Sequence, residues 1–193
     1  MAELKRQTRL SPADEGPPMD LSHPKSIFDL VNYQLHLVEF FSGLNITRLC
    51  EGVFGITRQE WRHIALLAGM GEMTPSELAL RSGLDRSRTS KMLMQLVEKG
   101  LVERHAYASD RRRAAVKLTP EGARLYEQVF PRVAELNKAL LAVLPEQDVR
   151  TLERVLGVLR RRAISLSRAK LVEGVADRRS GGSRKRWAAR PHS

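Results

Sequence analysis

The chain has 193 residues, a length that suits one globular domain and leaves little room for a second. Its 33 Lys and Arg residues outweigh 22 Asp and Glu residues, and the net charge of +11 favours a polyanionic partner such as nucleic acid or an anionic membrane surface. No run of about 18 apolar residues and no apolar secretory segment is present, so we expect a cytoplasmic protein that makes no membrane contact. The single cysteine, Cys50, fits a reducing compartment and a role in core packing.

The N-terminal part predicts a flexible arm followed by a long helix. Residues 1–22 are polar, contain three prolines and show no helical periodicity. From Lys25 to Glu51 apolar residues recur at helical spacing over more than one face: Ile27, Leu30, Val31, Leu35, Val38, Phe41 and Leu44. A helix with so wide an apolar surface needs partners on several sides, and a second subunit is one of them. We therefore predict that residues 23–56 form a dimerisation helix and that the protein is a homodimer.

Two capping patterns begin the next helices. Thr57 with Glu60 three residues later forms a capping box, and the helix that follows runs to about Ala68. Thr74 begins another box that Glu77 closes, with proline at the first helical position. These patterns predict two separate helices divided by a glycine-containing turn.

The second of these helices is short and leads into a third. Helix 75–81 stops at Gly83, Asp85 caps the helix from Arg86 to Lys99, and Gly100 ends it. Two helices joined in this way form a helix-turn-helix.

A charged hairpin follows directly. Residues 101–107 and 114–118 alternate as strands do, and residues 108–113 read as the turn between them. A hairpin after a helix-turn-helix is a wing, so residues 57–119 predict a winged helix-turn-helix DNA-binding domain.

The C-terminal part predicts two further helices and a tail. Thr119-Pro120-Glu121 begins a helix that runs to about Leu144 with Pro131 inside it, and Pro145-Glu146 begins the last one. The last helix carries an apolar stripe suited to packing on another helix: Val149, Leu152, Val155, Leu156, Leu159 and Ala163. We predict C-terminal dimerisation helices over residues 120–173, a flexible basic tail over 174–193, and a mainly α fold with a small β-hairpin wing.

The predicted DNA contacts lie in three places. A major groove admits one helix, whose N-terminal residues reach base edges: here Arg86, Ser87, Arg88, Thr89, Ser90 and Lys91. The preceding helix lies against the DNA backbone and contributes Thr74 and Ser76. Arg111, Arg112 and Arg113 at the hairpin repel one another unless an anion neutralises them, which a phosphate backbone or a narrow minor groove would do. The alternative is that both groups are ordinary solvated surface.

The stretch LRSGLDRSRTSKMLMQLVEKGLVERHAYASDRRRAAVKLTPEG resembles the helix-turn-helix and wing of the MarR family of bacterial regulators, including Asp110 and Arg112 ahead of Leu118 and Thr119. A weaker resemblance extends over residues 27–165, in which the helices follow the family order. It implies a six-helix triangular dimer whose first and last helices form the dimerisation domain and whose winged lobes bind a near-palindromic operator. It also implies that Arg112 reaches the minor groove or its phosphates and that Asp110 pairs with an arginine to hold the wing.

The resemblance further implies repression that a small molecule relieves. Such an effector, aromatic, acidic or an acyl-coenzyme A, would enter a pocket between the dimerisation helices and the DNA-binding lobe. In this chain the pocket would be lined by Tyr33, His36, Phe40, Trp61 and Arg62. The alternative reading is that the aromatic residues belong to the core or the dimer interface, His36 is a hydrogen-bonded histidine and Arg62 lies on the surface.

Other classes of function have less support. Phosphate-binding glycine loops, nucleophile elbows and HExxH motifs are absent from the sequence, so we expect neither an enzyme nor a cofactor. The histidines lack ligand spacing, so we predict no metal site. A redox switch would need Cys50 to find an intermolecular partner. A nonspecific architectural or RNA-binding winged-helix protein remains the main alternative, and it predicts equal affinity for operator and random DNA.

Overall fold

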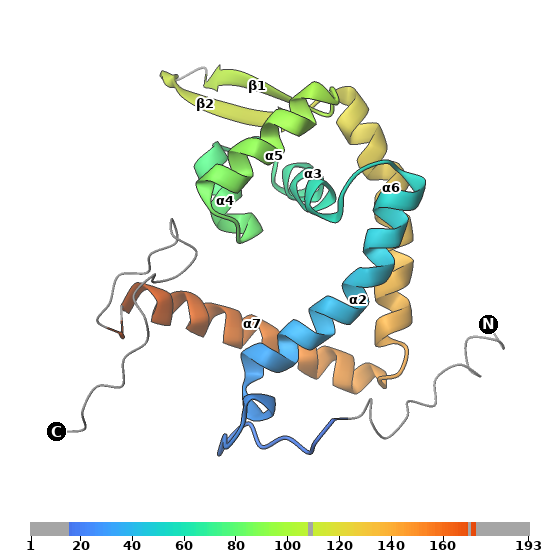
Figure 1. Ribbon diagram of the computed structural model, residues 1–193, viewed down its shortest axis with the longest axis vertical. Helices are drawn as coiled ribbons and strands as arrows, with labels where there is room; N and C mark the ends of the chain where they lie inside the picture. Colours follow the sequence, from blue (N-terminus) through green and yellow to red (C-terminus); the bar gives the residue numbers. More distant parts are fainter. Residues whose placement is uncertain (1–15, 108–109, 170, 173–193) are drawn as a thin grey trace, which may run out of the picture. The chain divides into compact units, whose positions relative to one another are not determined.

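The computed structural model describes residues 16–107, 110–169, 171 and 172. For residues 106, 107 and 110–113 it describes the backbone alone. The chain divides into two compact units, Met1–Leu140 and Leu141–Ser193, and each is described by itself. Six α-helices, one 3-10 helix and a two-stranded antiparallel sheet make up the described residues (Figure 1). The predicted mainly helical fold with a hairpin is confirmed. The predicted division into dimerisation helices and a DNA-binding domain stays a prediction.

The first long helix begins later than its sequence pattern predicts. A 3-10 helix, η1 (Ile27–Asp29), precedes α2 (Val31–Val53), and Leu30 between them is extended. The Asp29 carboxylate accepts hydrogen bonds from the backbone N–H groups of Asp20, Lys25 and Ser26, and these bonds hold the pKa of Asp29 down at about 2. Such local bonds compete with the helix and delay its start. The predicted start at Lys25 is therefore wrong.

The predicted helix boundaries of the helix-turn-helix are confirmed to within about two residues. The elements are α3 (Arg58–Met70), α4 (Pro75–Ser82) and α5 (Arg86–Glu98). Both capping boxes form, and Asp85 accepts from the backbone N–H of Arg88. Gly83 ends α4 at a φ of 73°, a left-handed conformation that favours glycine. The sharp turn between α4 and α5 follows from that residue.

The wing consists of β1 (Val102–Tyr107) and β2 (Asp110–Leu118). The pairing is regular from Val102 opposite Leu118 to Ala106 opposite Ala114, and Tyr107 then pairs with Asp110. Residues 111–113 therefore form a bulge in β2, and the predicted turn over 108–113 is too long. Backbone hydrogen bonds between Met73 and Val116, at 2.9 and 3.1 Å, join the wing to the segment before α4.

The hydrophobic core of the first unit lies where α3, α4 and α5 meet the wing and the ends of α2 and α6 (Pro120–Leu141). It is built from residues of all these elements: Cys50, Ile64, Leu67, Leu78, Leu93, Leu96, Val102, Val116 and Val129. Gly122 on α6 packs so closely on the Leu101 carbonyl that a Cβ there would overlap its oxygen. Helix α6 is thereby fixed against the base of the wing.

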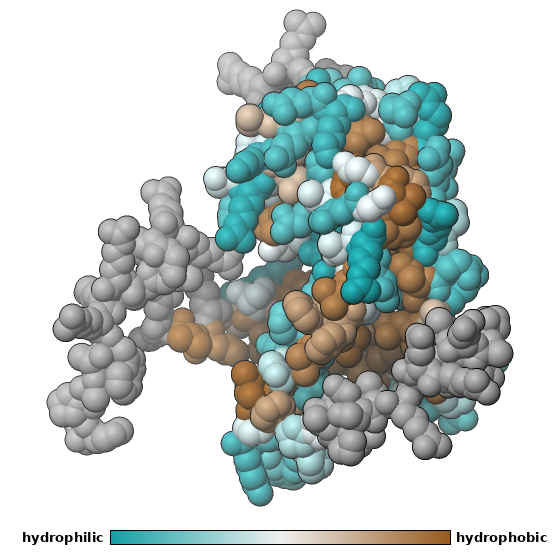
Figure 2. Space-filling view, turned by 45° about the vertical axis from the view of Figure 1, so that its right-hand side comes forward, coloured by the Kyte–Doolittle hydropathy of each residue, from teal (hydrophilic) through white to brown (hydrophobic). Residues whose placement is uncertain are grey.

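The second unit is built on α7 (Glu146–Ala169), which begins where the sequence predicts. Within this range no residue is buried, and Leu152, Val155, Leu156 and Leu159 of the predicted stripe are all exposed. The N-terminal part of α2 in the first unit also exposes apolar side chains, and the lower half of Figure 2, where it lies, shows many in brown. The described residues of each helix therefore include exposed apolar side chains.

Candidate nucleic-acid interface

Helix α5 presents a polar N-terminal turn to solvent. Its buried side carries Thr89, Leu93 and Leu96, at the spacing of one helix face. Arg86, Ser87, Arg88, Ser90 and Lys91 are exposed. The first turn also has the positive end of the helix dipole, and the Asp85 carboxylate already accepts from one of its backbone N–H groups, that of Arg88. A phosphate or an electronegative base edge would be attracted to this turn.

Thr89 is the exception in the predicted set. Its side chain is 1% exposed, and its hydroxyl donates a 2.9 Å hydrogen bond to the carbonyl oxygen of Asp85 one turn earlier. The residue therefore packs into the lobe and does not present its side chain to a groove. The polar character of the six residues does not show this, but the helical spacing of Thr89 from Leu93 and Leu96 does.

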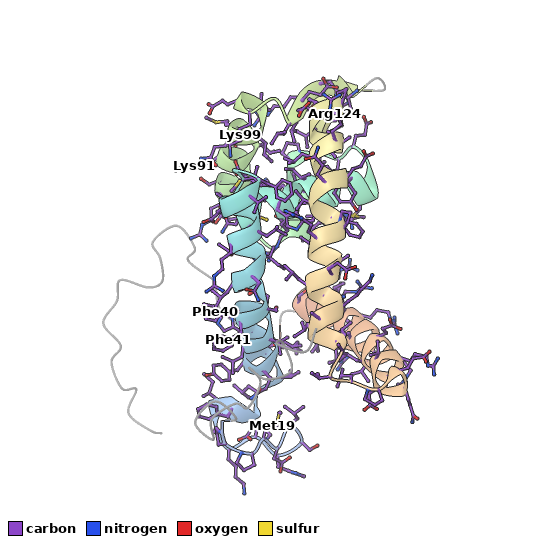
Figure 3. All side chains as sticks on the ribbon, turned by 90° about the vertical axis from the view of Figure 1, so that its right-hand side faces the viewer. Met19, Phe40, Phe41, Lys91, Lys99 and Arg124 are labelled. Atoms are coloured by element: carbon purple, nitrogen blue, oxygen red, sulfur yellow. The ribbon has the colours of Figure 1, made fainter. Side chains whose placement is uncertain are left out.

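The Arg88 side chain has a weak ion-pair partner. Its guanidinium forms a 3.5 Å ion pair with Asp85, and the arginine side chain is 75% exposed. An exposed pair of this kind contributes little to stability, so the guanidinium is available to a stronger acceptor. Lys91 is also exposed and lies one turn after Ser87 and Arg88 (Figure 3).

Helix α4, which begins at Pro75, packs against α5. Ser76 is exposed, whereas the Thr74 hydroxyl donates to Glu77 at 2.7 Å and accepts from the Glu77 N–H at 3.2 Å. The Thr74 hydroxyl is thus occupied by the capping box, and Ser76 has the freer side chain of the two.

The wing arginines stand on strand β2. Arg111, Arg112 and Arg113 form the bulge of that strand, next to Asp110. The side chains of these four residues lie outside the described part of the chain. At the base of the wing, His105 Nε2 lies 2.8 Å from Glu72 Oε2, and this contact joins β1 to the loop after α3. The wing backbone is therefore connected to the helical lobe at its base.

An ion pair between a half-exposed lysine and a buried glutamate connects α5 to α3, and sequence reasoning missed it. Lys99, the residue that ends α5, places its ammonium 2.9 Å from Glu60 Oε2 and 3.2 Å from the Gly55 carbonyl oxygen. Glu60 is 2% exposed and also accepts from the Thr57 N–H at 2.7 Å. The capping pattern identified Glu60, but Lys99 lies 39 residues away and carries no local signal.

A cavity of about 290 Å³ lies between α2 and α3. Its lining combines apolar residues with two arginines: Ile46, Arg58, Trp61, Arg62, Ala65 and Leu66. Trp61 is stacked on Tyr126 of α6, with ring centroids 5.7 Å apart and planes 13° apart. Aromatic and apolar walls with a few cationic groups suit a small aromatic anion.

Glu39 of α2 forms ion pairs with both arginines of this cavity. Its Oε1 atom contacts Arg58 Nη2 and lies 3.1 Å from Arg62 Nη2. The Arg58 guanidinium packs on Gly43, where a Cβ would overlap it. The sequence prediction included Arg62 but missed Arg58, which looked like an ordinary residue in the first turn of a helix.

The remaining predicted pocket residues lie elsewhere on α2. Tyr33 packs edge-on against Phe28 at 5.6 Å, and His36 lies 6.2 Å from the Phe40 ring. Phe40 and Phe41 lie on the side of α2 that faces away from α6 (Figure 3). Of the five predicted residues, Trp61 and Arg62 line the cavity, and the other three are not among its lining residues.

Two buried groups of the first unit have shifted pKa values. Burial raises the pKa of the Cys50 thiol to about 11. Burial also lowers the pKa of His63, whose Nδ1–H donates to the Gln59 carbonyl oxygen at 2.8 Å while its Nε2 finds no hydrogen-bond partner among the described residues. Both groups are therefore neutral at pH 7.

The described residues hold no cluster of three or more side chains placed to bind a metal ion. Among their helices, none combines the length and the apolar character needed to cross a membrane.

Comparison with known proteins identifies relatives over the whole lobe. The family model described as "MarR family" matches residues 54–113. The regulator FarR of Neisseria gonorrhoeae is 36% identical over 104 residues, which are 54% of this chain and 71% of FarR. The multiple antibiotic resistance protein MarR of Salmonella typhimurium is 34% identical over 52% of this chain and 71% of its own length.

Solved structures agree with these relatives. NadR in complex with 4-hydroxyphenylacetate has 30% identity and a TM-score of 0.62, and the match covers 74% of this chain and 97% of NadR. A mutant MarR from E. coli in complex with operator DNA has 28% identity and a TM-score of 0.60, over 67% of this chain and 92% of its own. The relatives are regulators of transcription and not enzymes. Sequence, fold and these matches together place the chain in the MarR family of transcriptional regulators.

Proposed function

We propose that the protein is a cytoplasmic homodimer that binds a near-palindromic operator sequence-specifically and represses transcription until a small effector releases it. The observation that carries this proposal is the N-terminal turn of α5, in which Arg88 and Lys91 are exposed beside the start of α4 and followed by a wing with three arginines. A helix of this kind fits the major groove, and the wing arginines suit the adjacent minor groove or its phosphates. The match to an operator complex over two-thirds of the chain supports the same orientation.

In this proposal the DNA contacts fall into two kinds. Arg88 reads a base edge, with Arg86, Ser87, Ser90 and Lys91 around it, and Arg112 contacts the backbone or minor groove with Arg111 and Arg113. Ser76 lies against a phosphate, and Thr74, whose hydroxyl and backbone N–H are both bonded to Glu77, caps the helix that positions Ser76. Asp110 steadies the wing. Base contacts set sequence preference, whereas phosphate contacts raise affinity for every sequence.

The exposed apolar surfaces of α2 and α7 support a dimer. Phe41 is 62% exposed, and η1, the residue after it and the N-terminal half of α2 add further exposed residues: Ile27, Leu30, Leu35, Val38 and Phe40. Contiguous apolar surface of this extent marks an interface rather than ordinary surface. A two-fold dimer would place its recognition helices about one turn of DNA apart, as half-sites of a palindrome require.

The cavity between α2 and α3 supports a small-molecule effector. Trp61 offers an aromatic wall, and Arg58 and Arg62 offer positive charge. A small aromatic acid matches both features, and NadR, one of the structural relatives, holds 4-hydroxyphenylacetate. A coenzyme A thioester of such an acid is the alternative.

The test compares two arginine variants on a duplex obtained by selection from random sequences. Arg88→Ala should weaken binding to that duplex and relax base preference at one position of each half-site, at a cost of about 1–3 kcal/mol. Arg112→Ala should weaken binding to all duplexes alike and reduce the salt dependence. Arg150→Ala, which removes an exposed arginine from α7, is the matched control and should leave both properties unchanged. Unchanged binding by both Arg88→Ala and Arg112→Ala would contradict the proposal.

A further inference from the structure

We propose that Glu39 is a built-in anion on the two arginines that line the cavity between α2 and α3, and that a carboxylate effector binds by replacing it on Arg62. This inference rests on the proposed effector site. It concerns what the site contains before the effector arrives.

The two arginines of the cavity are already paired. Arg58 and Arg62 both lie on α3, and a single oxygen of Glu39, on a different helix, contacts both of them. An incoming carboxylate would need the same guanidinium N–H groups, because guanidinium binds carboxylate through its fixed fork of donors. The ligand and Glu39 would also repel each other at this distance. The site therefore binds a carboxylate only in exchange for the existing ion pair.

The two ion pairs are not equally strong. Arg58 packs on Gly43 and also lies 3.4 Å from the backbone carbonyl oxygen of Glu39, so several contacts fix it. Arg62 is 44% exposed and holds Glu39 at 3.1 Å. An exposed pair contributes little stability, so it can exchange readily. Arg62 is the arginine that we expect to turn to the ligand, while Arg58 keeps Glu39 near α3.

Exchange would change a contact between helices. Glu39 belongs to α2, whereas Arg58 and Arg62 belong to α3, which packs against α4, α5 and the wing. A bound carboxylate would therefore weaken an ion-pair connection between the first long helix and the DNA-binding lobe. An uncharged ligand of the same shape would leave that connection intact.

The experiment measures carboxylate discrimination by tryptophan fluorescence. Trp187→Phe leaves Trp61, in the wall of the cavity, as the single tryptophan. In that background, 4-hydroxyphenylacetate and its uncharged amide are titrated into the parent, Glu39→Gln and Arg62→Gln. Glu98→Gln is the charge-matched control, because no ion pair of Glu98 is found among the described residues.

Glu39→Gln should bind the carboxylate about tenfold more tightly than the parent and bind the amide equally. Arg62→Gln should lose the preference for the carboxylate, and Glu98→Gln should match the parent. Equal carboxylate affinity in the parent and Glu39→Gln, an equal gain for the amide, or no binding of either probe to any variant would overturn the inference.

Binding to the selected operator is measured in parallel, so that the two proposals can fail separately. If the parent binds the selected operator specifically but Glu39→Gln does not change the carboxylate affinity, only the exchange is refuted. If the parent binds the selected operator no more tightly than random DNA, the proposed function is refuted.

Discussion

The ion pair between Lys99 and Glu60 makes a quantitative prediction about stability. Lys99→Met removes the ammonium and keeps a side chain of similar length and helix propensity. The Glu60 carboxylate, 2% exposed, then keeps the 2.7 Å hydrogen bond from the Thr57 N–H as its remaining described contact. Its charge stays buried without a counter-ion.

The expected cost follows from the degree of burial. Breaking a fully buried pair costs about 3–5 kcal/mol. Lys99 is 40% exposed, so water already weakens the pair and can partly replace the ammonium, which reduces the expected loss to about 1–2 kcal/mol. For a chain of this size that corresponds to a fall in Tm of about 2–8 °C.

The matched control is Lys138→Met. Lys138 forms a 2.8 Å ion pair with Glu135, and these side chains are 73% and 71% exposed, so the same substitution should leave the stability almost unchanged. Thermal and urea unfolding at one protein concentration measure both variants, because a dimer's Tm depends on concentration. In a Glu60→Gln background the cost of Lys99→Met should shrink, since no buried charge is left unpaired. Equal shifts for Lys99→Met and Lys138→Met would refute the reasoning.

Three further predictions concern the interior of the lobe. Gly122→Ala should destabilise the protein by about 2 kcal/mol or more, because its Cβ overlaps the Leu101 carbonyl oxygen, whereas Gly69→Ala, in open space on a helix, should be neutral or stabilising in the same urea titration. His63 has a lowered pKa, so its contribution is present above pH 6.5 and is lost as the pH falls. Wild type should therefore lose stability relative to His63→Leu between pH 7 and 5, by up to about 1.4 kcal/mol per pH unit, and parallel pH profiles would contradict this. The Cys50 thiol, with its pKa near 11, should react with a disulfide reagent far more slowly in the native protein than in urea. Rapid labelling of the native protein would contradict this and would support a redox switch at Cys50.

The sequence predicts helix boundaries well where side chains act locally. Thr57 with Glu60, Thr74 with Glu77, and Asp85 each cap a helix through contacts within three residues, so a short pattern contains the whole interaction. The start of α2 was predicted wrongly because the contact that decides it is not local. Asp29 is bonded to the backbone N–H of Asp20, nine residues earlier, and no helical pattern shows that bond.

The candidate site is predicted in part. The exposed residues at the start of α5 follow from helical periodicity once the helix is placed, and the same periodicity should have excluded Thr89. Residues 110–113 were missed as part of the strand because four charges in a row are typical of a turn, whereas Asp110 pairs with Tyr107 of β1 and residues 111–113 form a bulge. Glu39 and Lys99 could not be found, since their partners lie 19 to 39 residues away and only the packed fold brings them together.

The most direct test of the central claim is the ratio of affinities for specific and random DNA. The wild-type protein is titrated, at physiological salt, with the duplex obtained by selection and with a scrambled duplex of the same length and composition. A sequence-specific regulator should bind the selected duplex at least about a thousandfold more tightly, with a motif that is nearly palindromic. Equal affinity for the two duplexes would contradict the account and indicate a nonspecific architectural protein.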